Sequence, residues 1–221
     1  VTIFVTVVGT AVSVFINAMT GYVLQRKDFK WRNIFSFYFF FTTLFSGGLV
    51  PWYILCVKYL HLKNTIWALI VPNLLMGAFY VIMMRTYFTT NIPDAVIEAA
   101  RIDGAGEWRI LAKIVLPMST PIIATLALLV GLGYWNDWLN GLYYINNDKL
   151  YSIQVLLNKM LLDVQYLMSG ASGGALTQSI TLPATGIKMA VAVMGALPIL
   201  VVYPFFQKYF VKGIVIGAVK G

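Results

Sequence analysis

Five long apolar runs dominate this sequence and limit what it can fold into. They cover about residues 1–24, 34–57, 66–88, 119–140 and 187–207. A helix needs roughly 20 apolar residues to cross a bilayer core, so each run is long enough for one span. Only 11% of the residues are charged, whereas soluble domains carry about 25%. The sequence therefore predicts an all-α polytopic membrane protein with five transmembrane helices, in a single domain over residues 1–221.

The basic residues are distributed so that they orient these spans. Ten of the 16 lysines and arginines lie in residues 25–33, 89–118 and 208–221, and these segments fall on one side of a five-span arrangement. Cytoplasmic loops of membrane proteins are enriched in basic residues, so we expect all three to be cytoplasmic. This orientation puts the N-terminus outside and the C-terminus inside. Because the first span begins at Val1, we also expect an earlier helix, which gives about six spans in the full protein.

Other residue patterns argue against several classes of function. The net charge of +8 is spread over the connectors between spans, which favours membrane orientation over nucleic-acid binding. The single cysteine, Cys56, excludes a disulfide framework. His61 is the only histidine, and no metal ligands lie at useful spacing beside it. Residues 170–174 spell the hydrolase pattern G-x-S-x-G, but the strand, helix and catalytic partners that this pattern needs are missing, so we interpret the match as chance.

The connector over residues 89–118 has more predicted structure than a simple loop. Pro93 suits the first turn of a helix, and Asp94 favours its positive end. Gly104 and Gly106 then allow the positive φ of a tight turn, and a second short helix follows until Pro117. The apolar positions at helical spacing are Val96, Ile97 and Ala100 in the first helix and Trp108, Leu111 and Val115 in the second. The pattern predicts two short helices joined by a glycine elbow on the cytoplasmic face.

The same connector carries a family signature. The pattern is Glu-Ala-Ala, three residues, Gly, nine residues, Ile, one residue and Leu-Pro, and it resembles the signature loop of bacterial ABC-importer permeases. The matching residues are Glu98, Ala99, Ala100, Gly104, Ile114, Leu116 and Pro117. The run Asp103-Gly104-Ala105 is similar to the carbohydrate-importer branch, which includes the permeases of the maltose transporter. Residues 61–74 and 209–221 resemble that branch too, the latter in a form common among permeases for complex oligosaccharides.

This resemblance implies a mechanical role for the connector. In that family, the two short helices form a coupling element that docks in a cleft of a cytoplasmic ATPase subunit and transmits its closure to the spans. The residues to which the resemblance assigns this role are Glu98, Ala99, Ala100, Asp103, Gly104, Ile114, Leu116 and Pro117. We expect Glu98 to pair with a polar or basic ATPase group, and the face around Ala99, Ala100 and Leu111 to pack in the cleft. We also expect the tail, residues 208–221, to touch the ATPases.

The partners follow from the same resemblance. This sequence has no G-x-x-x-x-G-K-[ST] phosphate loop, so the ATPase is expected to be a separate polypeptide that binds ATP and magnesium. We therefore expect no cofactor in this chain and no catalytic activity of its own. The other implied partners are a homologous permease, a second ATP-binding subunit, an external solute-binding protein and a sugar or oligosaccharide. The implied location is the bacterial inner membrane.

Two further regions are candidates for contact with the cargo or its carrier. A sugar path needs aromatic faces for ring surfaces, and amides or carboxylates for hydroxyl groups. Residues of these types in the predicted spans are Asn73, Tyr80, Tyr134, Asn136 and Asp137. Packing between helices explains each of them at least equally well. The external segment 141–183 contains a predicted amphipathic helix at 149–162, and its residues 166–180 are a candidate loop toward the solute-binding protein.

Other transport mechanisms remain as alternatives. An ion-coupled secondary transporter usually carries buried ionisable residues and inverted repeats, whereas the span interiors here are nearly free of charge. A membrane scaffold without transport would have no need for the complete signature spacing. Within the importer class, the cargo could be a peptide, polyamine or amino acid instead of a sugar. The resemblance favours an oligosaccharide, for example a polysaccharide fragment such as an alginate oligomer.

Overall fold

The chain folds into helices joined by short connections. The computed structural model describes residues 1–72, 75–168 and 184–218, and this part of the chain contains no strand. The α-helices are α1 (Thr2–Gln25), α2 (Arg32–Leu44), α3 (Leu49–Ile54), α4 (Ala78–Asn91), α5 (Asp94–Ile102), α6 (Glu107–Ile110), α7 (Leu116–Met118), α8 (Thr120–Trp135), α9 (Leu139–Tyr144), α10 (Ile153–Met168) and α11 (Ala184–Ala218). Short 3₁₀ or π segments are η1 (Leu55–Tyr59), η2 (Ile66–Leu69), η3 (Leu111–Val115) and η4 (Asp148–Leu150).

Two of the candidate spans are single long helices, and two further candidates are bent pairs of helices. Within the described residues, α1 and the part Thr185–Phe205 of α11 are each long and apolar enough to cross a bilayer. The pair Arg32–Leu44 and Leu49–Tyr59 bends by 114°, and Gly48 with φ +86° lies at the break. A second break of 82° separates Glu107–Met118 from α8. The described part of the chain therefore holds two candidate spans, or four if each bent pair counts as one.

The prediction of one continuous span over residues 66–88 is wrong. Its first residues form only the 3₁₀ turn η2, and the α-helix begins at Ala78. Pro72 lies between them, and proline offers no backbone N–H for a continuing helix. α4 has 14 residues, which reach about 21 Å at 1.5 Å per residue. The central membrane segment is thus a turn followed by a short helix. The expected tail also differs, because α11 continues through residues 208–218.

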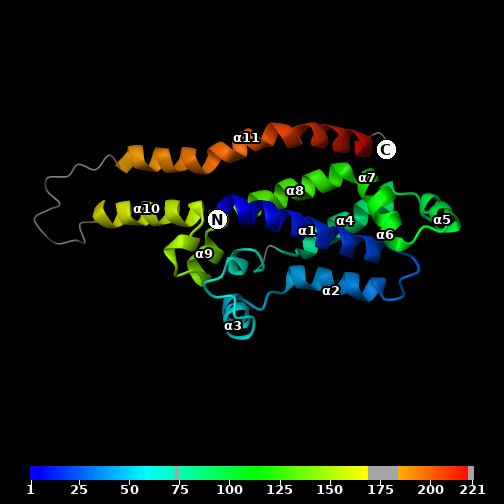
Figure 1. The fold of residues 1–221 in the computed structure, drawn as a ribbon, viewed down its shortest axis with the longest axis horizontal. Helices are drawn as coiled ribbons and strands as arrows, with labels where there is room; N and C mark the ends of the chain where they lie inside the picture. Colours follow the sequence, from blue (N-terminus) through cyan, green and yellow to red (C-terminus); the bar gives the residue numbers. More distant parts are fainter. Residues whose placement is uncertain (73–74, 169–183, 219–221) are drawn as a thin grey trace, which may run out of the picture.

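The three basic segments lie at one end of the molecule. Figure 1 shows the connection after α1, the helices α5 and α6, and the C-terminal end of α11 at the same end of the long axis. α10 and α9 lie toward the other end. The amphipathic helix expected at 149–162 is α10, which begins slightly later and runs further, over Ile153–Met168. The three basic segments therefore lie together, as expected if all of them are on the cytoplasmic side of the membrane.

The centre of the bundle is α1, which packs against both α4 and α8. Glycines permit these close approaches. A Cβ added to Gly21 would lie 2.8 Å from the Cβ of Met84 in α4. A Cβ added to Gly9 would lie 2.6 Å from Cζ of Tyr134 in α8. Because the Tyr134 hydroxyl donates a 2.8 Å hydrogen bond to the Ile70 carbonyl, this ring is held in place.

Gly9→Val is therefore expected to destabilise the bundle. The added side chain would meet a ring that cannot move aside without breaking its hydrogen bond, and overpacking of this kind costs about 1–3 kcal/mol. Thermal unfolding of the detergent-solubilised protein should show a lower Tm. Gly131→Ala is the matched control at the same helix pair, because its Cβ would lie 3.4 Å from Thr10 Oγ1. Equal Tm values for the two variants would contradict this packing account.

Candidate functional site

The signature connector forms a protrusion from α5, α6, η3 and α7 at the end of the bundle (Figure 1). Pro93 is the N-cap residue of α5, and Asp94 lies in its first turn, where a carboxylate is favoured by the helix dipole. The elbow is Gly104, with φ +78°. The backbone N–H of Ala105 donates to the Ala100 carbonyl at 2.9 Å, which is the wrapped helix end that a left-handed glycine permits. The elbow predicted at Gly104 is confirmed, whereas Gly106 has φ −71° and is the N-cap residue of α6. We call residues 94–118 the coupling loop, after the role that the resemblance to importer permeases implies for it.

One face of the coupling loop is buried against its own bundle. Ile97, Ala100, Ile110, Leu111 and Val115 all belong to the hydrophobic core cluster. The same cluster contains residues of α1 and α4. The prediction that Ala100 and Leu111 form an outward docking face is wrong. These positions face inward because they share the helical spacing of Ile97 and Val115, which the core covers.

The opposite face presents different apolar residues to the outside. Ile102 is 87% exposed and Trp108 is 65% exposed. Glu98, Ala99 and Asp103 are exposed as well. Sequence reasoning did not single out Ile102 and placed Trp108 on the covered face. The helical spacing could have predicted that Ile102 is exposed. It lies five residues after the buried Ile97, and this spacing rotates it by about 140° around the helix, away from the buried face.

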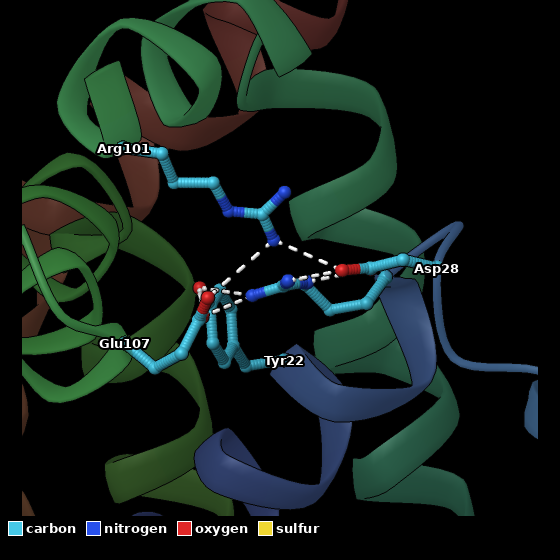
Figure 2. Close-up of polar contacts among 5 residues, drawn as sticks. Tyr22, Asp28, Arg101 and Glu107 are labelled. Atoms are coloured by element: carbon cyan, nitrogen blue, oxygen red, sulfur yellow. Dashed lines mark hydrogen bonds and ion pairs between the residues drawn. The ribbon is translucent and has the colours of Figure 1, made fainter.

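Five polar residues attach the coupling loop to the end of α1. We call Tyr22, Arg26, Asp28, Arg101 and Glu107 the ionic cluster (Figure 2). Glu107 Oε2 accepts a hydrogen bond of 2.9 Å from the Tyr22 hydroxyl and another from Arg26. Arg101 Nη2 lies 3.1 Å from Asp28 Oδ2 and 3.4 Å from Glu107 Oε1. The cluster joins positions up to 85 residues apart, so no local pattern could reveal it in the sequence.

The charges of the ionic cluster are balanced. Arg26 Nε donates to Asp28 Oδ1 at 2.9 Å, and this hydrogen bond lowers the pKa of the Asp28 carboxyl. The Arg26 side chain is only 15% exposed. A neighbouring ion pair joins Lys27 to Asp94 at the start of α5, so three basic and three acidic side chains neutralise one another. Among the described residues, no ion pair includes the exposed Glu98, Asp103, Arg109 or Lys113.

The last signature residues lie where the coupling loop meets the spans. Ile114 and Leu116 are half-buried and pack against the core, whereas Pro117 is exposed. Leu116 also lines an apolar cavity of about 150 Å³. The residues that line this cavity are Ala11, Val14, Phe15, Ala18, Met19, Leu111, Leu116 and Ile123. The interface between α1 and the base of the coupling loop is therefore incompletely packed.

Four of the five residues predicted for a translocation path lie in the described part of the chain. Tyr134 is buried between helices, and Tyr80 is half-buried in α4. The Asn136 side chain donates to the Leu132 carbonyl at 2.9 Å, at the end of α8. Asp137 Oδ1 accepts the Asn140 backbone N–H at 3.1 Å, at the start of α9. These contacts are structural, and a role in transport stays a prediction for these four residues.

Some of the predicted regions lie outside the described residues. These are Asn73, the G-x-S-x-G segment 170–174 and all but the first three residues of the candidate loop 166–180.

Comparison with known proteins identifies the relatives of this chain. It is 42% identical over 223 residues to the polygalacturonan/rhamnogalacturonan transport system permease protein YtcP of Bacillus subtilis, covering all of this chain and 76% of the relative. It is 42% identical over 221 residues to the B. subtilis protein LplC, covering all of this chain and 73% of the relative. The arabinooligosaccharides transport system permease protein AraQ of Halalkalibacterium halodurans is 30% identical over 221 residues, with 99% of this chain and 72% of the relative covered.

A solved structure and a family pattern agree with these relatives. A chain from the crystal structure of a bacterial ABC transporter involved in the import of the acidic polysaccharide alginate superposes with a TM-score of 0.80 at 29% identity. The superposition covers 95% of this chain and 72% of that one. The family described as binding-protein-dependent transport system inner membrane component matches residues 17–216. By fold, by signature and by relatives, the chain belongs to the binding-protein-dependent transport system inner membrane component family.

Proposed function

We propose that this chain is a permease subunit of an ATP-driven importer for oligosaccharides, and that it forms the translocation path together with a homologous permease. The observation that carries this proposal is the coupling loop. It bears the complete signature, projects from one end of the bundle and leaves Ile102 and Trp108 exposed beside unpaired charges. Isolated exposed apolar residues are common, but two large ones on a short, well-folded protrusion are typical of a docking surface.

The proposed partner at the coupling loop is a cytoplasmic ATPase subunit. Ile102 and Trp108 insert into its cleft, and Glu98, Ala99 and Asp103 line the rim of the contact. Gly104 sets the angle between the two helices. Ala100, Ile114 and Leu116 do not contact the ATPase. They pack the loop against its own bundle and so hold the contact residues in position. Pro117 lies beside the break that separates the loop from α8. Two such ATPases bind ATP and magnesium and supply the energy.

The proposed orientation follows the basic residues. The coupling loop and the C-terminal end of α11, residues 208–221, lie in the cytoplasm, and the N-terminus of the chain lies outside the bacterial inner membrane. In this orientation α9 and α10 lie on the external side. The solute-binding protein delivers its cargo there, and residues 166–180 are the proposed contact. Asn73, Tyr80, Tyr134, Asn136 and Asp137 are the proposed residues of the path.

The proposed cargo is an oligosaccharide derived from a polysaccharide. Three of the similar proteins are described as acting on polygalacturonan or rhamnogalacturonan, arabinooligosaccharides and alginate. Two of these descriptions name acidic polymers, so the proposed cargo includes oligosaccharides that carry carboxylates. The net charge of +8 adds a favourable field for an anionic solute, although most of it lies on the cytoplasmic connectors.

Hydrolysis of ATP by the reconstituted importer tests this proposal. The complex in proteoliposomes, supplied with its binding protein, is expected to hydrolyse ATP faster when that protein carries an oligosaccharide than when it carries a peptide, a polyamine or nothing. Oligogalacturonate, an alginate oligomer and a neutral arabino-oligomer are compared at equal occupancy of the binding protein. The expected rise is about tenfold, within the range of roughly 5- to 150-fold that is usual for a coupling between distant sites. Stimulation by a non-sugar solute alone would contradict the proposed cargo.

A further inference from the structure

The coupling loop is joined to three spans in two different ways. α4 leads into α5 through Ile92 and Pro93, and α7 leads into α8 through Ser119. These two helices are attached through the backbone and follow any displacement of the loop. α1 has no such backbone connection to the loop, because the chain continues from its last residue, Gln25, into α2. It nevertheless packs against both α4 and α8 at the centre of the bundle.

Apolar packing alone does not fix the position of α1 relative to the coupling loop. Between α1 and the base of the loop lies the apolar pocket of about 150 Å³, which is partly open and is lined by Ala18 and Met19 of α1, by Leu111 and Leu116 of the loop and by Ile123 of α8. Side chains that face this pocket do not contact one another across it, and they lose those dispersion contacts. Nonpolar contact also has no direction, so it resists sliding less than hydrogen bonds do.

The ionic cluster closes this interface at the end of α1. It holds the coupling loop on both sides of the Gly104 elbow: Arg101 of α5 contacts Asp28, and Glu107 of α6 contacts Arg26 and Tyr22. Lys27 adds a third attachment at Asp94, the first residue of α5. Residues 22–28 are thus linked to the beginning and end of α5 and to the beginning of α6. Arg26 donates hydrogen bonds to the carboxylates of both Asp28 and Glu107.

The chemistry of these contacts suits a rigid connection. A guanidinium presents several N–H groups in a fixed plane, so Arg26 can bond two carboxylates and fix the geometry of both. The Arg26 side chain is 15% exposed, so its interactions are screened less than those of an open surface pair, while its partners Asp28 and Glu107 are 57% and 52% exposed. The cluster is also internally neutral together with the Lys27–Asp94 pair. It therefore needs no charge from the ATPase and remains intact while the exposed face of the loop is docked.

We propose that the ionic cluster is the link that makes α1 follow the coupling loop, so that movement of the ATPase reaches the central helix of the permease. Arg26, Arg101 and Glu107 are positioning residues that touch neither ATP nor cargo. This inference rests on the proposed function of the coupling loop. Without the cluster, the ATPase still docks on Ile102 and Trp108 and still hydrolyses ATP. α1 then no longer moves with the loop, and hydrolysis is uncoupled from transport.

The test uses the complete importer with Arg26→Gln, Glu107→Gln and the double variant Arg26→Gln with Glu107→Gln. Lys30→Gln is the matched control, since Lys30 is an exposed basic residue in the same connection and takes part in no ion pair among the described residues. Each complex is assayed for co-purified ATPase, basal ATP hydrolysis and uptake of labelled cargo.

Each single variant is expected to retain ATPase and basal hydrolysis while uptake falls about tenfold, within the usual range of coupling between sites. The double variant should lose less uptake than the two single losses combined, because both substitutions remove the shared Arg26–Glu107 contact. Lys30→Gln should behave as wild type. Wild-type uptake in both single variants would overturn the inference, and so would a loss of ATPase in parallel with uptake or fully additive losses in the double variant. Failure of the wild-type complex to hold an ATPase would instead overturn the proposed function.

Discussion

Gly104→Val is expected to uncouple transport without unfolding the membrane spans. Gly104 has φ +78°, and a β-branched residue forced into this region costs about 1–3 kcal/mol. A Cβ at this position would meet nothing within 4 Å, so the cost comes from the backbone and not from a clash within the chain. The strained elbow relieves itself by changing the angle between α5 and α6. Because the strain falls on the coupling loop, the contacts of α1 with α4 and α8 remain.

Co-purification of the ATPase and uptake of labelled oligosaccharide measure this effect. The expected loss in ATPase association is about 5- to 150-fold, the equivalent of 1–3 kcal/mol, at near-normal abundance of the permease in the membrane. Gly104→Asn is the matched control, because asparagine tolerates positive φ better than other side chains. It should retain most of the uptake. Full uptake by Gly104→Val at normal abundance would show that the elbow geometry does not matter for docking.

The second large effect is expected from Ile102→Ser combined with Trp108→Ala. These are the two most exposed large apolar residues of the coupling loop, and truncation of a buried aromatic anchor at an interface costs about 2 kcal/mol or more. The double variant should therefore weaken ATPase association by about 30-fold or more. Glu98→Ala should have a smaller effect, because an exposed ion pair contributes about 0–1 kcal/mol. A larger effect of the apolar double variant than of Glu98→Ala indicates that apolar contacts, and not ion pairs, dominate docking.

Titration of purified permease with its ATPase in detergent measures this association. Trp31→Ala is the matched control, since Trp31 is also a tryptophan in a basic connection and is 55% exposed. It should leave the affinity unchanged. A larger effect of Glu98→Ala than of the Ile102 and Trp108 changes would mean that charge pairing dominates the contact. An equal effect of Trp31→Ala would mean that exposed tryptophans contribute non-specifically.

The architecture could be predicted where it depends on length and hydrophobicity. The all-α fold and the spans α1 and α11 follow from apolar runs that are long enough to cross a bilayer. The break within 66–88 was missed because hydropathy does not register how Pro72 interrupts a helix. The bend at Gly48 was missed for a related reason: only the backbone angle reveals whether a glycine is used for its positive φ.

The location of the candidate site could be predicted from the sequence. Which of its apolar side chains are buried and which are exposed could not. The sequence predicted two short helices with a turn at Gly104, and the structure has this turn, with positive φ at Gly104. Periodicity grouped Ala100 and Leu111 correctly with other apolar positions, but it cannot say whether such a group faces the chain itself or a partner. Here the core covers that group, which leaves Ile102 and Trp108 outside. The ionic cluster depends on tertiary contacts between α1 and the coupling loop, so no spacing rule could find it.

The central claim is that the exposed face of the coupling loop docks on an ATPase, and site-specific photo-cross-linking tests it most directly. A photoreactive phenylalanine analogue replaces Ile102 in the assembled complex, and in a second sample it replaces Trp31. Irradiation at position 102 is predicted to give a covalent adduct with the ATPase, at a yield that changes when ATP is added. Position 31 is predicted to give none. An adduct from position 31, or a complex that holds its ATPase while position 102 cross-links only to lipid or to another permease, would contradict the account.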